Sequence, residues 1–170
     1  SFEDVLVVSC MLISLIKHAD RVKIGCVAQL VNVIAPIMTP NGGGIHRQTI
    51  FYPYLHASTY GRRIALDLKI KSSTYEDSIF GQVPYLESVA VWNPEAEKLT
   101  IFAVNRNLDQ GVSLIGDLRD FEDYRIMSHT ILEHENLKAF TSFGHPDEVK
   151  PHTYSGIEVK KWATGRRFTR

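Results

Sequence analysis

The run of residues 22–37 constrains the fold of this chain more than any other segment. Its sequence, VKIGCVAQLVNVIAPI, is apolar on both faces, and beyond Lys23 only two uncharged amides, Gln29 and Asn32, interrupt it. This pattern is typical of a parallel strand that other elements cover on both sides. In a barrel of alternating strands and helices, polar side chains collect at the carboxyl ends of the strands, where active sites lie. The run therefore predicts a barrel strand that carries functional amides.

A helix is predicted on either side of this run. The first spans residues 2–18, where Ser1 can cap the start, and apolar side chains surround nearly all of it. Such a helix needs neighbours on several sides. The second occupies residues 47–60, kinks or starts afresh near Pro53, and ends at Gly61. Helix, strand and helix together predict an α/β segment.

From residue 64 onward the pattern changes to short strands with alternating apolar and polar side chains. The predicted strands are residues 64–70, 86–92, 99–105, 112–118 and 124–132. Turn sequences such as Asn93-Pro94-Glu95 separate them. Strands at intervals of about 8 to 12 residues, joined by such turns, are typical of an antiparallel sandwich. The second part of the chain is therefore predicted to be all-β.

Composition excludes several partners. The 170 residues include 19 basic and 19 acidic side chains, so the sequence shows no electrostatic footprint for nucleic acid or for an anionic membrane. The longest apolar stretch is about half of what a membrane span requires. Cys10 and Cys26 lie among aliphatic residues, which predicts buried, reduced thiols and a cytoplasmic protein. The seven histidines lack the spacing of a zinc site, so we expect no metal and no cofactor.

A family resemblance follows from three longer stretches. HADRVKIGCVAQLVNVIAPIMT (residues 18–39) and RQTIFYPYLHASTYGR (residues 47–62) resemble the last barrel segment of the α-L-arabinofuranosidases of glycoside hydrolase family 51. VPYLESVAVWNPEAEKLTIFAVNRNLDQ (residues 83–110) resembles the β-sandwich domain that follows the barrel in that family. The likeness extends in continuous order over residues 2–152.

The resemblance implies a fold of the class α/β plus all-β. Its parts are the terminal segment of a TIM (β/α)8 barrel and an antiparallel β-sandwich of the jelly-roll type. We expect residues 1–62 to form the incomplete end of the barrel and residues 63–154 to form the sandwich without its closing strand. Residues 155–170, which do not resemble the family's last strand, are expected to form a divergent basic tail.

The resemblance also implies an activity. Family 51 enzymes remove terminal arabinofuranosyl groups from arabinan, arabinoxylan and their oligosaccharides with retention of configuration, which requires two carboxyl groups. In the family both are glutamates on earlier barrel strands, which would precede Ser1. We therefore expect no catalytic residue in this chain and no activity of the chain alone. Arabinose-containing saccharides and further copies of the same chain are the expected partners.

One substrate-binding residue can be carried over from the family. Gln29, in the AQLVN stretch, matches a glutamine that lies in the sugar subsite at the end of the last barrel strand. Its amide offers a donor and an acceptor without a charge, although such a residue can also serve as a core amide. Asn32 is expected to be structural. His46 occupies a position where the family often has tryptophan, which would alter that wall of the cleft.

A different class of function remains open, in which the chain is a stand-alone β-sandwich module for carbohydrate binding or assembly. Trp92, Phe102 and Phe121 are candidate platforms for stacking a sugar, although aromatic residues in strands more often belong to the core. A binding module should present an exposed row of aromatic side chains on one face of a sheet.

Overall fold

The computed structural model describes residues 1–162 and 165–169, of which residues 158–162 and 165–169 are described by their backbone only. The chain forms two compact units. The first comprises Ser1–Arg106 and Glu133–Lys150, and the second comprises Asn107–Leu132 and Pro151–Arg170. Each unit is therefore built from two separate stretches of the chain.

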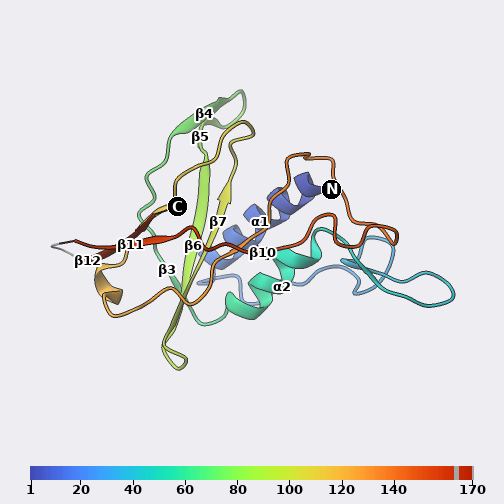
Figure 1. Ribbon diagram of the computed structural model, residues 1–170, viewed down its shortest axis with the longest axis horizontal. Coiled ribbons are helices and arrows are strands. Elements are labelled where there is room, and N and C mark those ends of the chain that lie inside the picture. The colour runs from blue at the N-terminus through green and yellow to red at the C-terminus, as the bar shows by residue number, and fades with distance from the viewer. Residues whose placement is uncertain (163–164, 170) are drawn as a thin grey trace. The chain divides into compact units, whose positions relative to one another are not determined.

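The first unit contains both α-helices and the longest strands (Figure 1). Its elements are α1 (Phe2–Lys17), β1 (Ile37–Met38), β2 (His46–Arg47), α2 (Phe51–Tyr60), β3 (Ile64–Leu66), β4 (Thr74–Asp77), β5 (Gly81–Pro84), β6 (Leu86–Asn93) and β7 (Lys98–Asn105). The antiparallel sheets of this unit are β1-β2, β4-β5 and the three-stranded β3-β6-β7.

The second unit consists of short strands and one turn of 3-10 helix. Its elements are β8 (Ile115–Asp117), η1 (Arg119–Phe121), β9 (Thr130–Ile131), β10 (His152–Thr153), β11 (Glu158–Trp162) and β12 (Gly165–Thr169). β12 pairs antiparallel with both β11 and β8, and β10 pairs antiparallel with β9. The backbone of the predicted tail thus contributes two strands to a sheet. The basic side chains of this tail, those of Lys160, Lys161, Arg166, Arg167 and Arg170, lie outside the described residues.

The core of the first unit forms where α1 crosses β6 and β7. Ile13 of α1, Val89 of β6 and Val104 of β7 are buried together, and Leu6, Cys10, Ile16 and Phe102 pack around them. Figure 1 shows α1 beside these two long strands. Full burial of one such aliphatic side chain is worth about 1.5 to 3 kcal/mol. The helix predicted at residues 2–18 is confirmed, and one of its faces supplies this core.

An ionic cluster fastens the end of α1 to the same strands. The carboxylate of Glu87 on β6 forms ion pairs with Lys17 at the end of α1 and with Arg106 just after β7, the latter at 3.3 Å. Arg106 also donates from Nε to the carbonyl of Pro84 at 2.9 Å. Because the Glu87 side chain is only 19% exposed, it needs both cations to compensate for its lost hydration. Burial raises the pKa of the nearby Cys10 thiol, so that this cysteine stays protonated.

The beginning of α1 is held by a distant part of the chain. The backbone N–H groups of Phe2 and Glu3 donate to the carbonyls of Ala139 and Leu137 at 2.7 and 2.9 Å. The first four N–H groups of a helix have no partner within the helix. Residues 133–150, which we call the strap, therefore satisfy two of them. Lys138 of the strap also pairs with the carboxylate of Glu3.

The second helix begins later than its sequence suggests and ends where predicted. Pro53 occupies the first turn of α2, where its missing N–H leaves no hydrogen bond unmade. The N–H of Gly61 closes the last turn by donating to the carbonyl of Ala57 at 2.8 Å. α1 and α2 pack against each other, and Ile16 of α1 lies against Gly61.

The continuous strand expected over residues 22–37 is wrong. Residues 22–30 form no helix or strand, Val31 makes only an isolated bridge to Ile37, and the residues of β1 pair with β2. Asn32 and Val33 have φ angles of 63° and 55°, which turn the chain back on itself. The physical reason is pairing, because a strand covered on both faces needs neighbouring strands, and residues 22–30 have none beside them. Several large apolar side chains are consequently exposed: Ile24, Leu30, Val33 and Ile34.

Of the five strands predicted from residue 64 onward, two form at nearly full length and three form only in part. Residues 86–92 and 99–105 are confirmed as β6 and β7. Of the other three predicted runs, only the short strands β3, β8 and β9 form. The hairpin of β4 and β5 was not predicted, because its sequence is largely polar and lacks strict alternation. The assignment of residues 1–62 to a barrel and of residues 63–154 to a sandwich stays a prediction.

We predict that Gly61→Ala destabilises the chain by about 1 to 3 kcal/mol, the usual cost of overpacking. A Cβ at this position would lie 2.5 Å from the carbonyl oxygen of Ala57 and 2.9 Å from Cδ1 of Ile16. The measurement is urea denaturation followed by circular dichroism. Gly144→Ala is the control, because a Cβ there meets nothing within 4 Å. Equal stability of both variants would contradict the prediction.

Candidate functional site

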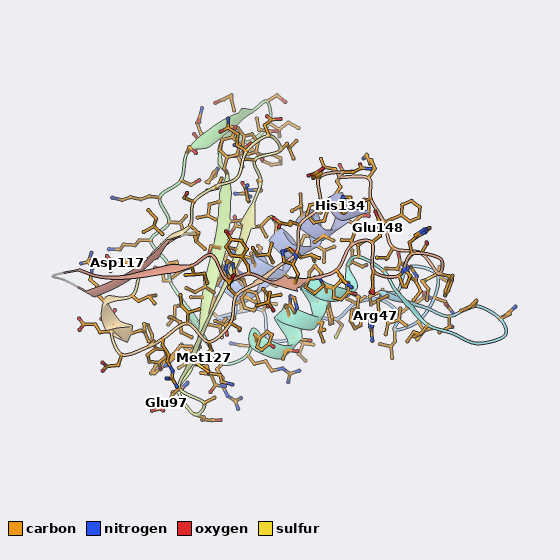
Figure 2. The ribbon with its side chains drawn as sticks, viewed as in Figure 1. Arg47, Glu97, Asp117, Met127, His134 and Glu148 are labelled. Atoms are coloured by element: carbon orange, nitrogen blue, oxygen red, sulfur yellow. The ribbon has the colours of Figure 1, made fainter. Side chains whose placement is uncertain are left out.

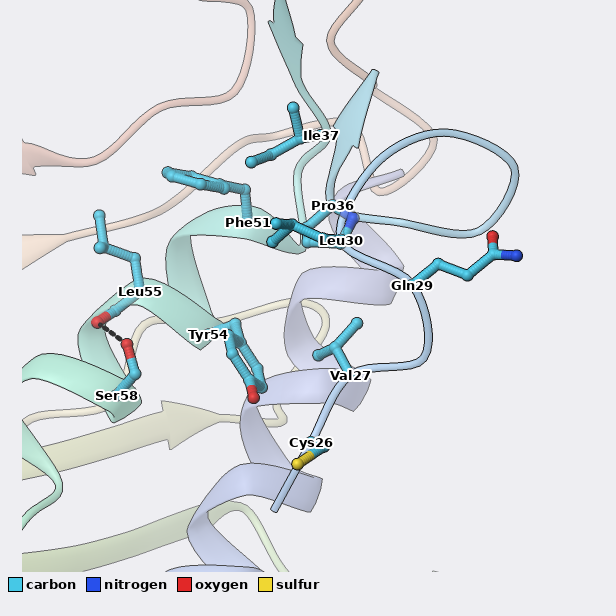
Figure 3. A pocket seen from close by; sticks show the side chains of 10 residues that line it. All are labelled: Cys26, Val27, Gln29, Leu30, Pro36, Ile37, Phe51, Tyr54, Leu55 and Ser58. Carbon is cyan, nitrogen blue, oxygen red and sulfur yellow. Dashed lines mark hydrogen bonds between the residues drawn. The ribbon is translucent and has the colours of Figure 1, made fainter. Parts of the chain in front are cut away.

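A hollow of about 300 Å³ lies between the irregular segment before β1 and one side of α2. Figure 3 shows the side chains that line it: Cys26, Val27, Gln29, Leu30, Pro36, Ile37, Phe51, Tyr54, Leu55 and Ser58. Most of them are apolar, and the hydroxyl of Ser58 is used in a hydrogen bond to the carbonyl of Leu55 at 3.0 Å. The hollow therefore offers an apolar wall with few polar groups.

One long-range hydrogen bond holds the segment beside the helix. The hydroxyl of Tyr54 on α2 donates to the carbonyl of Gly25 at 3.0 Å. Beyond this point, the amide of Gln48 donates to the carbonyl of Ala35 at 2.7 Å, and the N–H of Gln48 donates to the carbonyl of Pro36 at 2.8 Å. Two fastenings, one before and one after residues 26–34, thus define the shape of this loop.

Gln29 lies at the rim of the hollow. Its side chain is exposed and points away from the other lining side chains (Figure 3). Its φ angle of 63° is in the left-handed region, which residues other than glycine seldom adopt. The amide makes no hydrogen bond to any residue that the structure describes. Gln29 is therefore available to a ligand, and its assignment as a substrate-binding residue stays a prediction.

Asn32 has the contacts of a structural residue. Its Oδ1 accepts the N–H of Thr39 at 2.8 Å, and its Nδ2 donates to Oγ1 of the same threonine at 3.0 Å. Its backbone N–H donates to the carbonyl of Ile37 at 2.8 Å. These bonds close the loop of residues 32–39, as expected for an asparagine that adopts a left-handed conformation.

His46 does not line the hollow. It is only 6% exposed, and its ring stacks at a tilt against Phe143 of the strap with 5.2 Å between centroids. Its Nε2 is buried without a hydrogen-bond partner among the described residues. The side chain of His46 thus lies under the strap, and the expectation that it alters a wall of the cleft in the complete enzyme stays a prediction.

The strap was not predicted from sequence. Oγ1 of Thr141 donates to the carbonyl of Arg47 at 2.8 Å, which ties the strap to β2. His134 and Glu148, near the two ends of the strap, lie together in Figure 2, with 3.4 Å between Nε2 and Oε1. His134 Nδ1 also accepts the N–H of Asn136 at 3.0 Å. No local sequence pattern predicts the contacts that the strap makes, because the contacting residues are far apart in the sequence.

The expected buried thiols are found only in part. Both cysteines are free, and Cys10 is half-buried, but Cys26 is exposed. The reason is the irregular conformation of residues 22–30, which leaves Cys26 at the wall of the hollow. Among the described residues no group of three or more histidine, cysteine or acidic side chains could hold a metal ion. Neither helix of the described part combines the length and apolarity that a bilayer crossing requires.

The candidate stacking aromatics do not form one row. Phe102 belongs to the core beneath α1. Trp92 lies on the other face of the same sheet, because it pairs with Leu99 while Phe102 pairs with Val89 three residues earlier on β6. Phe121 belongs to the second unit, where its ring contacts Tyr124 at 5.0 Å. The described residues thus lack the feature that a stand-alone carbohydrate-binding module should show.

Comparison with known proteins decides the family. A model of the alpha-L-arabinofuranosidase C-terminal domain matches residues 1–169. This chain belongs to that family. The chain is 55% identical over 152 residues to the intracellular exo-alpha-(1->5)-L-arabinofuranosidase of Halalkalibacterium halodurans, and the match covers 89% of this chain and 30% of that relative. It is 49% identical over 169 residues to intracellular exo-alpha-(1->5)-L-arabinofuranosidase 1 of Bacillus subtilis, with coverage of 99% and 33%.

Solved structures show the same likeness. A family 51 alpha-L-arabinofuranosidase from Bifidobacterium longum matches with a TM-score of 0.87 and 30% identity, over 99% of this chain and 33% of that one. A family 51 arabinofuranosidase from Xanthomonas axonopodis pv. citri matches in fold, with a TM-score of 0.81 and 22% identity over 99% of this chain and 33% of that one. The resemblance drawn from the sequence is thereby confirmed. The chain spans about a third of the length of the relatives it matches.

We predict that Tyr54→Phe loosens the segment of residues 22–30, because it removes the hydrogen bond to Gly25 and leaves the ring in place. The net loss should be about 0.5 to 1.5 kcal/mol. Amide hydrogen exchange of residues 22–30 measures it. Tyr52→Phe is the matched control, since no described residue hydrogen-bonds its hydroxyl. Unchanged protection in Tyr54→Phe would show that the hydrogen bond does not hold the segment.

Proposed function

We propose that this chain is the C-terminal portion of a retaining α-L-arabinofuranosidase that removes terminal arabinofuranosyl groups from arabinan, arabinoxylan and their oligosaccharides. The observation that carries the proposal is the similarity to two intracellular exo-arabinofuranosidases at 55% and 49% identity over 89% and 99% of the chain. Identity at this level along nearly the whole chain favours a shared role in the larger enzyme. The names of these relatives also support a cytoplasmic location.

Retention of configuration needs two carboxyl groups about 5 to 5.5 Å apart, one as the acid/base and one as the nucleophile. We assign neither role to a residue of this chain, and we place both in the larger protein of which the relatives are examples. The contribution of the arabinofuranosidase domain is then to complete the substrate site. An exposed amide at the rim of a hollow suits this task, because it can donate to one sugar hydroxyl and accept from another.

We propose Gln29 as the residue that contacts the sugar. Its amide is exposed and unused by the described residues, and the loop that carries it is fastened on both sides, by Tyr54 to Gly25 and by Gln48 to Ala35. A fastened loop can hold an amide in one place, and good positioning lowers the entropic cost of binding. In the complete enzyme we further propose that residues 1–62 close a barrel, that residues 63–154 form a sandwich beside it, and that the subunits assemble into homo-oligomers.

We predict that the isolated chain hydrolyses no arabinofuranoside, because an oxocarbenium-like transition state requires an acid/base and a nucleophile that this chain does not supply. The assay uses purified chain and 4-nitrophenyl α-L-arabinofuranoside, with release of nitrophenolate as the readout. A full-length relative is the positive control. Turnover that a single carboxylate substitution within residues 1–170 abolishes would refute the proposal.

A second prediction concerns Gln29 in the complete enzyme. Gln29→Ala should lower kcat/KM by about tenfold to a thousandfold, which corresponds to about 1.4 to 4 kcal/mol, with little change in melting temperature. The matched control is Gln110→Ala, which removes the same side chain from an exposed loop of the other unit. Unchanged kinetics of Gln29→Ala would remove Gln29 from the substrate site.

A further inference from the structure

The face of the sheet that α1 covers is open at its far end. On this face α1 packs over the cross-strand pair of Val89 and Phe102. The pair of Val91 and Thr100 lies on the same face, two residues after Val89 on β6 and two residues before Phe102 on β7. Here the sheet borders a hollow of about 380 Å³, which we call the basic hollow. This volume falls in the range of small-molecule sites, about 300 to 1,000 Å³.

Three stretches of the first unit line the basic hollow. They are the end of α2, the connection to β3, and the far ends of β6 and β7. The lining residues are Thr59, Tyr60, Arg62, Arg63, Val91, Asn93, Ala96, Lys98 and Thr100. Val91 is only 2% exposed and gives the hollow a dry, aliphatic side. None of these residues lines the hollow of Gln29.

Positive charge dominates this lining. Arg62 donates from Nε to the carbonyl of Ser58 at 2.6 Å. Because a carbonyl carries no net charge, this hydrogen bond does not neutralise the guanidinium. Arg63 pairs with Glu95 at 2.9 Å, and the ammonium group of Lys98 has no partner among the described residues. The lining thus carries three cationic side chains, and the carboxylate of Glu95 compensates only one of them.

The other acidic residue of the turn does not offset this charge. Glu97 lies in the turn between β6 and β7 (Figure 2), is exposed, and does not line the basic hollow. The hollow therefore keeps a positive excess, as a site for a carboxylate or phosphate would.

The remaining lining suits a sugar. Tyr60 is 54% exposed, and its ring lies near that of His56 one turn earlier, with 6.3 Å between ring centroids. An aromatic face of this kind can carry the apolar face of a sugar ring. The hydroxyls of Thr59 and Thr100 and the amide of Asn93 supply donors and acceptors for sugar hydroxyls. Charge, an aromatic face and neutral polar groups thus meet in one place.

The backbone at Arg63 is strained where it enters this site. Its φ angle of 109° lies well outside the region that residues with a side chain normally adopt. Such strained conformations concentrate at functional sites. The side chain of Arg63 lines the hollow and pairs with Glu95 on the β6–β7 turn.

We propose that the basic hollow binds a sugar that carries a carboxylate, that is, a uronate. The carboxylate lies between Lys98 and Arg62, and the sugar ring rests against Tyr60. The site is separate from Gln29 and does not depend on the proposed hydrolytic activity. It gives the arabinofuranosidase domain a second contact with saccharides that contain acidic residues.

The test is an NMR titration of the 170-residue chain with D-galacturonate, with D-galactose as the neutral match and inorganic phosphate as the plain anion. We expect galacturonate to shift amides of residues 59–63 and 91–100 in a saturable way, and to bind at least about fivefold more tightly than either control. Lys98→Met and Tyr60→Ala should each weaken galacturonate binding by about three- to tenfold. Lys69→Met, which removes an exposed lysine elsewhere in the same unit, should leave it unchanged.

Each alternative result overturns the proposal. Equal binding of galactose would show that the carboxylate plays no part, and equal binding of phosphate would show a site for anions in general. Shifts that miss residues 59–63 and 91–100, or the absence of saturable shifts, would place no uronate site here. The amide spectrum of each variant reports whether it is folded, and Lys98→Met and Tyr60→Ala test the same site from two different elements, β7 and α2.

Discussion

The contact of Ile13 with Val89 and Val104 is the constraint on which the first unit depends. It joins a helix from the beginning of the chain to two strands that follow about seventy residues later. The ionic cluster around Glu87 lies at one end of this contact, and the basic hollow lies beyond its other end. α2 is placed indirectly, since it packs on α1. α2 contributes lining residues to both hollows, so this packing contact bears on the position of one wall of each.

The parts of the fold that the sequence predicts are those whose pattern is local. α1 carries a serine at its N-cap position and a mostly apolar composition, and β6 and β7 are two mostly apolar runs on either side of an Asn-Pro turn. Residues 22–37 show why the rest could not be predicted. An apolar run is compatible with a buried strand, but only pairing with neighbours makes it one, and composition carries no information about which neighbours are present. The strap could not be predicted for a related reason, because the residues that it contacts lie more than ninety positions away in the sequence.

The sequence predicts one residue of the candidate site, Gln29, but not the residues that surround it. Gln29 stands out in the sequence as a polar group in an apolar run, and the structure places it at the rim of a hollow with its amide exposed. The hydrogen bond from Tyr54 that fastens its loop joins residues 29 positions apart, and no motif links them. The basic hollow is assembled from three stretches, and its charges are unremarkable in each stretch alone. Sites of this kind become visible only when the topology is known.

The strap also bears on how this unit folds. Its pairing of Lys138 with Glu3 closes a loop of 135 residues, and the N–H groups at the start of α1 find their partners only when that loop closes. Contacts so distant in sequence carry a large entropic cost before they give any stabilisation, and chains rich in them fold slowly. The first turn of α1 should thus be among the last backbone to order. Synthesis from the N-terminus would expose that helix end until the strap had emerged.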